Sequence, residues 1–328
     1  MNSERPWLLP LVPLYRLGQM IVELRSAPVH KLRWPVISIG NLSTGGAGKT
    51  PLTIALAKAL AGQGMHVDVL SRGYGRNNKS AARVDPNGTA EEFGDEPLVI
   101  ARDAGVHVFV AAERYEAGLM AEAERIDSMK LAVHLLDDGF QHRRLARNVD
   151  ILLLNRQDWN DTLLPAGNLR EPLKAAQRTS AIAIPADDPQ LESELRSWGW
   201  QGAVWRLHRR MEIPSIDGPV AAFCGIARPE QFFTGLESAG LHIASRTAFP
   251  DHHRYVPHDF DCLLDAARNV RATAFITTEK DCARLGQLTA SLSDAIPLKV
   301  ANLRIEIENE AEAIGWLIAR CGLVGRSC

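Results

Sequence analysis

Apolar and polar positions follow one another along the chain in two alternating patterns. Short apolar runs rich in β-branched residues predict buried strands, and the longer segments between them space their apolar residues as helices do. The predicted strands are 36–39, 66–71, 106–110, 131–136, 149–154, 181–184, 203–213, 220–225, a stretch near Ala244, 274–277 and 298–307, and the predicted helices are 52–60, 112–126, 229–239, 258–269 and 308–321. Apolar strands separated by helices indicate an α/β fold, with a parallel sheet covered on both faces.

The extended segment 203–213, followed by turn-like residues, indicates a domain boundary. We expect 203–213 and 298–307 to pair as a two-stranded linker, which would return the last helix to the first domain. A single crossing between the domains is the alternative. The predicted organisation is a parallel-sheet core domain over residues 1–210, a second, smaller α/β domain over 211–304, and a C-terminal helix over 305–328 that returns to the core.

The N-terminal 25 residues are unusually apolar, and Pro10 and Pro13 favour a helix that starts near Pro13. The run is too short to span a bilayer, and the charged residues inside it make it too polar to do so. We expect no cleavable signal peptide. Residues 1–34 contain five basic and two acidic side chains. An apolar surface flanked by basic residues is typical of a helix that lies on an anionic membrane. A helix that packs on the domain core is the alternative.

Composition narrows the class of protein. Hydrophobic residues make up 46% of the chain and charged residues 23%, which is ordinary for a globular protein, and a net charge of −2 gives no reason to expect a nucleic-acid partner. The five cysteines are odd in number and form no C-x-x-C pair. They therefore suit a reducing compartment better than a disulfide framework or a zinc site.

A glycine-rich turn directly follows the first predicted strand and leads into Lys49-Thr50 and a helix. This order is the context that a phosphate-binding loop of the P-loop NTPase type requires, because small residues let backbone N–H groups surround phosphates at a helix N-terminus. The predicted nucleotide-binding residues are Ser43, Thr44, Gly45, Gly46, Ala47, Gly48, Lys49 and Thr50. The strict pattern has glycine at position 43, where this chain has serine. An ordinary glycine turn before a helix is the alternative.

Acidic residues at the end of a nearby strand would complete such a site. Asp137 and Asp138 follow an apolar strand, where a carboxylate could hold Mg²⁺ together with the Thr50 hydroxyl. Phosphoryl transfer to a hydroxyl also needs a group that accepts or orients the proton of the acceptor. Asp95, which we expect in a loop, and His252 are candidates, because carboxylate–imidazole pairs tune one another. Each could instead be structural, as a turn residue and a core histidine.

Seven segments carry a more specific signal when they are taken together. They are residues 40–51, 71–75, 94–97, 137–142, 164–172, 251–253 and 278–281, in this order. In this combination the chain resembles, nearly end to end, the tetraacyldisaccharide 4′-kinase family of lipid A biosynthesis. The serine at position 43 is shared by that family, so it does not weigh against nucleotide binding.

The resemblance implies a role for each matching residue. Residues 43–50 would bind ATP, with Lys49 and Thr50 on phosphate and Mg²⁺, and Asp137 and Asp138 would be the Walker B acids that hold the metal. Asp95 would be the catalytic base and His252 the histidine that tunes it, although the adjacent His253 could take that place. Arg170, in the segment 164–172, would stabilise phosphate charge near the reaction.

The resemblance also implies the reaction and its setting. An ATP- and Mg²⁺-dependent lipid kinase would transfer the γ-phosphate to the 4′-hydroxyl of tetraacyldisaccharide 1-phosphate and give lipid IVA. Its partners would be this acylated lipid and the membrane surface, through the N-terminal helix at the cytoplasmic face of the inner membrane, with no obligate protein partner. The alternatives are a P-loop GTPase of the metallochaperone type and a non-catalytic, membrane-bound scaffold that depends on ATP.

Overall fold

The computed structural model describes residues 5–24, 28–46, 48–124, 131–286 and 288–323. The strands are β1 (Val36–Asn41), β2 (His66–Ser71), β3 (Ala82–Arg83), β4 (His107–Val110), β5 (Ala132–Leu136), β6 (Val149–Leu153), β7 (Ala181–Pro185), β8 (Ala203–Glu212), β9 (Val220–Cys224), β10 (Ile243–Ala248), β11 (Ala274–Thr278) and β12 (Leu298–Ile307). They form one sheet in the order β10-β9-β11-β12-β8-β7-β6-β1-β5-β2-β4-β3. Its neighbours run parallel except β12 with β8 and β3 with β4, so the predicted α/β fold with a mostly parallel sheet is confirmed.

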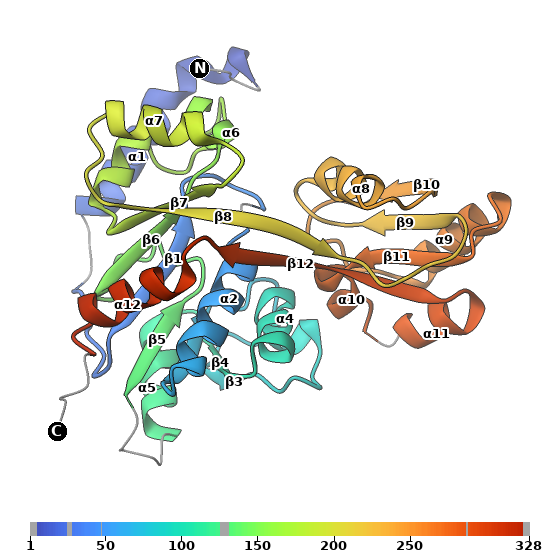
Figure 1. Ribbon diagram of the computed structural model, residues 1–328, viewed down its shortest axis with the longest axis horizontal. Helices are drawn as coiled ribbons and strands as arrows, with labels where there is room; N and C mark the ends of the chain where they lie inside the picture. Colours follow the sequence, from blue (N-terminus) through green and yellow to red (C-terminus); the bar gives the residue numbers. More distant parts are fainter. Residues whose placement is uncertain (1–4, 25–27, 47, 125–130, 287, 324–328) are drawn as a thin grey trace.

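Two long strands join the left-hand and right-hand parts of this sheet (Figure 1). The first half of β8 pairs with β7 and its second half with β12, while the first half of β12 pairs with β11. The predicted pairing of the two extended segments is therefore confirmed. The expected domain boundaries, after residues 210 and 304, fall inside β8 and β12, and backbone hydrogen bonds run across both positions. The division into two domains stays a prediction.

Helices cover both faces of the sheet (Figure 1). They are α1 (Val12–Leu24), α2 (Lys49–Gly62), α3 (Ala90–Phe93), α4 (Asp95–Ala104), α5 (Arg114–Glu124), α6 (Arg156–Asn160), α7 (Pro189–Ser197), α8 (Pro229–Ser238), α9 (Pro257–Asn269), α10 (Glu279–Leu285), α11 (Leu288–Ala295) and α12 (Glu310–Arg320), with 3₁₀ turns η1 (Pro6–Leu11) and η2 (Leu173–Arg178). Alternate residues of β1 point to opposite faces, so Ile37 and Ile39 join the core under α2, α4 and α12. The last helix thus packs on the core beside α2, as its predicted return requires.

The N-terminal helix leaves most of its apolar side chains in water. In η1 and α1, Trp7, Leu14, Leu17 and Met20 are each more than half exposed. Two polar side chains attach the helix to the rest of the molecule, because Tyr15 Oη donates a hydrogen bond to the Arg170 carbonyl (3.2 Å) and Gln19 donates to the same oxygen. In the part of the chain that the structure describes, no helix has the length and apolar character needed to cross a bilayer.

Two segments near the site are more regular than the sequence indicates. Asp95 was expected in a loop, but it is the first residue of α4, and Gly94 before it has φ of 91°, which turns the chain out of α3. The apolar pattern of the sequence does not predict α10, which begins directly after β11. The first turns of α4 and α10 are polar, so the spacing of apolar residues does not reveal these helices. The acidic residues in both first turns were the available signal, because they favour helix N-termini.

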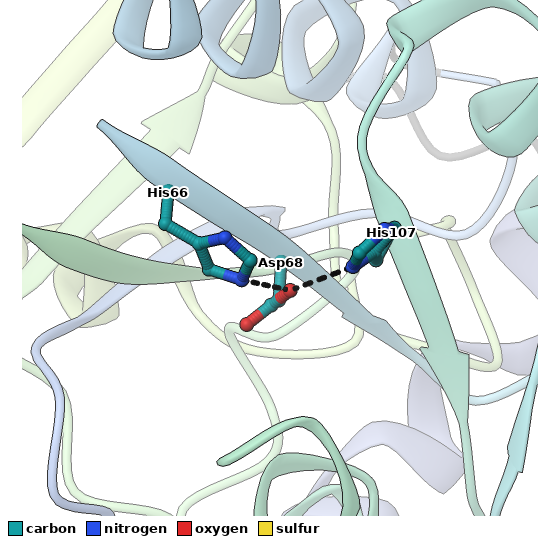
Figure 2. Close-up of side chains that lie close together, drawn as sticks. All are labelled: His66, Asp68 and His107. Atoms are coloured by element: carbon teal, nitrogen blue, oxygen red, sulfur yellow. Dashed lines mark hydrogen bonds and ion pairs between the residues drawn. The ribbon is translucent and has the colours of Figure 1, made fainter. Parts of the chain in front are cut away.

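A buried carboxylate lies within β2, toward the beginning of that strand. Asp68 of β2 is 1% exposed, and Figure 2 shows His66 and His107 directed at it from the beginnings of β2 and β4. Asp68 and His107 are register partners in the parallel β2–β4 pair.

Candidate active site

The glycine-rich loop connects the end of β1 to the beginning of α2. Gly45 and Gly48 adopt φ of 97° and 90°, in the left-handed region that favours glycine. Gly48 is the N-cap residue of α2, and a Cβ placed on it would lie 3.2 Å from Nη2 of Arg209. The strand–loop–helix order predicted for phosphate binding is therefore present, with Thr50 buried in the first turn of α2. Ala47 lies outside the described residues.

Ser43 stands where the strict loop pattern has glycine, and its surroundings explain why serine fits. It is 1% exposed and forms an antiparallel bridge with Leu169. Its hydroxyl accepts a hydrogen bond from Asn41 Nδ2 (3.1 Å), and its carbonyl accepts one from Arg170 Nε (3.1 Å). Position 43 is thus an extended residue tied to the segment that carries Arg170, where glycine is not required.

Asn41 connects the two cationic side chains of the site, although the sequence analysis gave it no role. It is fully buried, and its Oδ1 accepts hydrogen bonds from Lys49 Nζ (3.0 Å) and Arg170 Nη2 (2.7 Å). A polar residue at the carboxyl end of an apolar strand, directly before the loop, was the available signal. The contact holds the ammonium and the guanidinium side by side at the end of β1.

Asp138 completes this cationic cluster. Its Oδ1 lies 3.4 Å from Lys49 Nζ and 3.1 Å from Arg170 Nη2. Burial alone would raise the pKa of Asp138, but the charges of Lys49 and Arg170 outweigh burial and lower it to about 2. The side chain is therefore a carboxylate at neutral pH, and it orients both cations.

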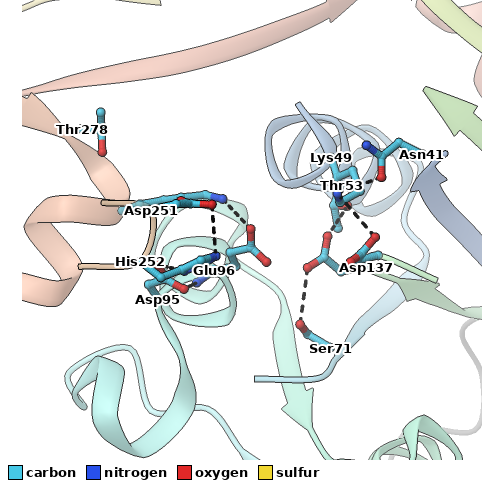
Figure 3. Close-up of polar contacts among 12 residues, drawn as sticks. Asn41, Lys49, Thr53, Ser71, Asp95, Glu96, Asp137, Asp251, His252 and Thr278 are labelled. Atoms are coloured by element: carbon cyan, nitrogen blue, oxygen red, sulfur yellow. Dashed lines mark hydrogen bonds and ion pairs between the residues drawn. The ribbon is translucent and has the colours of Figure 1, made fainter. Parts of the chain in front are cut away.

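Asp137 lies in a different environment one residue earlier. It is 1% exposed, and it accepts hydrogen bonds from the hydroxyls of Thr53 (3.3 Å) and Ser71 (3.4 Å), as Figure 3 shows. Burial, together with the negative charges of Glu96 and Asp138, raises the pKa of Asp137 to about 7. The described surroundings thus supply too little positive charge to stabilise this carboxylate, which fits a position beside a bound cation.

Asp95 and His252 meet across from Lys49 and Asp137 (Figure 3). His252 Nδ1 lies 3.1 Å from Asp95 Oδ2, and Arg284 Nε lies 3.3 Å from the same oxygen. Burial pushes the pKa of Asp95 upward, but the His252 hydrogen bond and the charges of Lys280, His252 and Arg284 hold it below its ordinary value. The same hydrogen bond raises the pKa of His252. The pair therefore combines a carboxylate with an imidazole that favours its protonated form.

The backbone determines which of the two adjacent histidines reaches Asp95. His252 has φ of 57°, and its N–H donates to the Gly225 carbonyl (3.1 Å). Its ring lies against Tyr74, with 5.0 Å between centroids. His253 instead contacts Asp259, with Nε2 2.8 Å from the carboxylate. In this geometry His252 is the partner of Asp95.

One pocket of about 1290 Å³ is lined by residues of the first group and by His252, the partner of Asp95. Lys49, Asp137, Asp138 and Arg170 line it from one part of the sheet, and His252 from the other. Figure 3 shows Lys49 and Asp137 facing His252 and Asp95. Glu96, next to Asp95, forms an ion pair with Lys280 of α10. This ion pair fixes α4 against α10 beside the pocket.

Basic side chains without a role in the sequence analysis line another part of this pocket. They are Arg72, Arg114, His142, Arg143 and Arg144. Burial and the charge of Arg114 lower the pKa of His142 to about 4, so its imidazole is neutral at physiological pH. Arg114 is 7% exposed, which is rare for arginine outside a functional or paired setting. The run 142–144, directly after the Asp137-Asp138 segment, was the available sequence signal.

Comparisons with known proteins give a consistent result. A family model described as Tetraacyldisaccharide-1-P 4′-kinase matches residues 5–321. A Tetraacyldisaccharide 4′-kinase of Koribacter versatilis is 40% identical over 299 residues, covering 88% of this chain and 89% of that protein. One from Rhodopseudomonas palustris is 37% identical and covers 96% and 92%, respectively. A crystal structure of LpxK from Aquifex aeolicus in complex with ATP has a TM-score of 0.73 at 30% identity and covers 95% of this chain and 98% of that chain.

Proposed function

The chain belongs to the tetraacyldisaccharide-1-phosphate 4′-kinase family, and we propose that it transfers the γ-phosphate of ATP to the 4′-hydroxyl of its lipid substrate, giving lipid IVA. One structural observation supports this reaction independently of family membership. His252, which contacts the buried Asp95, lines the same pocket as Lys49 and the acids at the end of β5. A proton acceptor therefore faces a phosphate-binding loop across a space large enough for a nucleotide and a sugar.

Asp95 is the group that takes the proton of the acceptor hydroxyl. Its pKa lies below the ordinary value, so it is ionised at neutral pH. His252 donates a hydrogen bond to it and keeps the carboxylate in one orientation. As the 4′-oxygen forms its bond to the γ-phosphorus, the O–H proton passes to Asp95, the bond from the γ-phosphorus to the bridging oxygen breaks, and ADP leaves.

Lys49 and Arg170 neutralise charge on the transferred phosphoryl group. Asn41 and Asp138 hold both side chains at one end of β1, so their charges are in place before the substrates bind. Preorganised cations stabilise the transition state without reorganisation during the reaction. The helix N-terminus at Lys49 adds favourable potential for phosphate.

Thr50, Asp137 and Asp138 are the residues that would hold Mg²⁺. The raised pKa of Asp137 supports this, because a buried carboxylate of this kind is stabilised by an adjacent cation. When bound, Mg²⁺ supplies charge neutralisation at the phosphates. Asp138 is already paired with Lys49 and Arg170. We therefore assign Asp137 as the main carboxylate ligand of Mg²⁺.

The basic part of the pocket suits the acceptor's own phosphate. Arg72, Arg114 and Arg143 line the pocket beyond the Asp137-Asp138 turn, and arginine recognises phosphate through two parallel N–H donors. The substrate named by the family carries one phosphate, at position 1. Binding that phosphate here would direct the far sugar ring, with its 4′-hydroxyl, toward Asp95.

The N-terminal segment is the surface that would contact the membrane. Trp7, Leu14 and Leu17 are each more than half exposed, and basic residues follow in 25–33. Apolar side chains that water surrounds in the isolated protein gain free energy on entering the lipid interface. A peripheral position on the cytoplasmic face of the inner membrane would bring the pocket to its acylated substrate. The two parts of the molecule that β8 and β12 join would act as domains that close on this substrate.

A lipid kinase assay tests the proposed function. Purified protein, Mg²⁺, the disaccharide 1-phosphate in detergent micelles and γ-labelled ATP are expected to give labelled lipid with one added phosphate at the 4′-position. Parallel reactions with GTP and with no lipid separate this activity from a GTPase and from a scaffold. Nucleotide hydrolysis without labelled lipid would reject the kinase.

A further inference from the structure

We propose that His66, Asp68 and His107 form a binding site for a divalent transition-metal ion, of which Zn²⁺ is the best match. The three side chains extend from the beginnings of β2 and β4 and converge on one point (Figure 2). Their ligand atoms all lie within 4.8 Å of one another.

The strands themselves produce this convergence. His66 and Asp68 are two residues apart on β2, so their side chains lie on the same face of the sheet. His107 is the register partner of Asp68 on β4 and therefore stands beside it. Three ligands on a hydrogen-bonded sheet need no loop closure, so little conformational freedom is lost when a metal binds.

The distances match a metal site that needs only small side-chain rotations. Asp68 Oδ1 lies 3.0 Å from His66 Nε2 and 3.9 Å from His107 Nδ1. With Zn–ligand bonds of about 2.0–2.2 Å and tetrahedral angles, two ligand atoms are separated by roughly 3.3 Å. His107 is the side chain that must move, and it is 46% exposed, so it has room to do so.

The donor set selects the class of metal. Two imidazole nitrogens and one carboxylate oxygen are ligands that zinc and similar transition metals take. Mg²⁺ and Ca²⁺ prefer all-oxygen sites, so this cluster discriminates against the magnesium that the kinase uses. Three protein ligands leave a fourth position for water or an external ligand.

A second layer of side chains lies behind the buried ligand. His134 is fully buried, and its Nδ1 lies 3.7 Å from Asp68 Oδ2 while its Nε2 lies 3.5 Å from Glu122 Oε1. Glu122 Oε1 in turn accepts hydrogen bonds from the backbone N–H groups of Arg33 (2.7 Å) and Trp34 (3.0 Å). Such outer partners orient ligating carboxylates and histidines in known metal sites.

The site is open to solvent and is separate from the kinase pocket. His66 and His107 are 25% and 46% exposed, and the nearby Arg83 is paired with Glu124 at 3.3 Å, which reduces its repulsion of a cation. None of the three ligands lines the pocket. Asp68 is three residues from Ser71 of the active site, or about 10 Å along the strand. Because its ligands come from both β2 and β4, a bound metal would link these two strands and stabilise the fold.

Cobalt substitution and thermal unfolding test the proposal in the full-length reduced protein, with Mg²⁺ in excess. We expect one Co²⁺ per chain with the visible absorption of a low-coordinate site, displaced by Zn²⁺, and a rise in Tm of roughly 5 °C at saturating Zn²⁺. H107Q and H66Q should lose both signals. Asp68 is left unchanged because its removal would disturb the core.

H258Q is the matched control. His258 is another exposed histidine, and Cys262 lies 3.7 Å from its Nε2, so this pair is the obvious competitor for zinc. The H258Q variant should keep the Co²⁺ spectrum and the Tm shift. Absence of stoichiometric binding in the unchanged protein, binding that survives in H107Q and H66Q, or binding that is lost in H258Q would overturn the proposal. Neither readout depends on kinase activity.

Discussion

His252 Nδ1 lies 3.1 Å from Asp95 Oδ2 although 157 positions separate the two residues along the chain. Asp95 begins α4 beside the P-loop part of the sheet, and His252 follows β10 at its other end. Each residue alters the ionisation of the other, since the contact lowers the pKa of Asp95 and raises that of His252. The contact therefore links the position of the β9–β11 part to the chemistry of the pocket.

Replacing His252 should move the acid limb of the pH profile. In the proposed mechanism Asp95 must be ionised to accept a proton, so activity is expected to fall as the pH drops through the pKa of Asp95. H252A removes a contact that lowers this pKa while Asp95 stays buried, so the pKa rises and activity is lost at a higher pH. The measurement is kcat/KM against pH for the unchanged protein and the variant.

H253A is the control for this experiment, because His253 contacts Asp259 and not Asp95. Its acid limb should match that of the unchanged protein, even if its Tm falls. If the acid limb shifted in H253A and not in H252A, His253 would be the residue that tunes Asp95, and the account given for His252 would be wrong.

Asn41 should matter for catalysis more than for stability. N41A removes the oxygen that receives hydrogen bonds from Lys49 and Arg170, and hydrogen bonds to charged groups contribute about 1.5–3 kcal/mol. We expect kcat/KM for ATP to fall by roughly 10- to 100-fold. N148A is a matched control, since Asn148 accepts a hydrogen bond from Val36 N (3.0 Å) at the other end of β1. Equal losses of activity in both variants would indicate a general loss of folding.

The exposed leucines of α1 should carry membrane binding. Leu14 and Leu17 are 67% and 54% exposed, and each contributes up to about 1.5–3 kcal/mol when fully buried in an apolar phase. The double variant L14E/L17E should bind anionic phospholipid vesicles at least about 10-fold more weakly in a co-sedimentation assay. L119E changes a leucine on α5 that is 46% exposed and should bind like the unchanged protein. Unchanged partitioning of L14E/L17E would remove α1 from the membrane contact.

The sequence predicts the sheet better than it predicts the site. Strands such as Val36–Asn41 are buried on both faces, so continuous apolar runs identify them, and the pairing of β8 with β12 follows from two extended segments of similar length. The loop and the Asp137-Asp138 turn are local motifs. The sequence does not single out Asn41, because its importance comes from Lys49, eight positions away, and Arg170, 129 positions away, which meet on its side chain only in the folded protein.

The sequence also does not show which of His252 and His253 contacts Asp95. The two neighbours differ through backbone geometry, because the left-handed φ of His252 directs it to Asp95 while His253 faces Asp259. The cluster of His66, Asp68 and His107 was equally hidden. Its residues fit a strand pattern, and only the register of β2 with β4 brings them together.

Single-turnover transfer by D95A tests the central claim most directly. Preloaded with ATP and Mg²⁺ and then mixed with excess lipid substrate, the variant should transfer phosphate at least about 100-fold more slowly than the unchanged protein. Its affinity for ATP, measured separately, should stay the same, because Asp95 contacts His252 and Arg284 and is not part of the phosphate loop. A transfer rate near that of the unchanged protein, or a loss of ATP binding that accounts for the defect, would contradict the assignment of Asp95 as the proton acceptor.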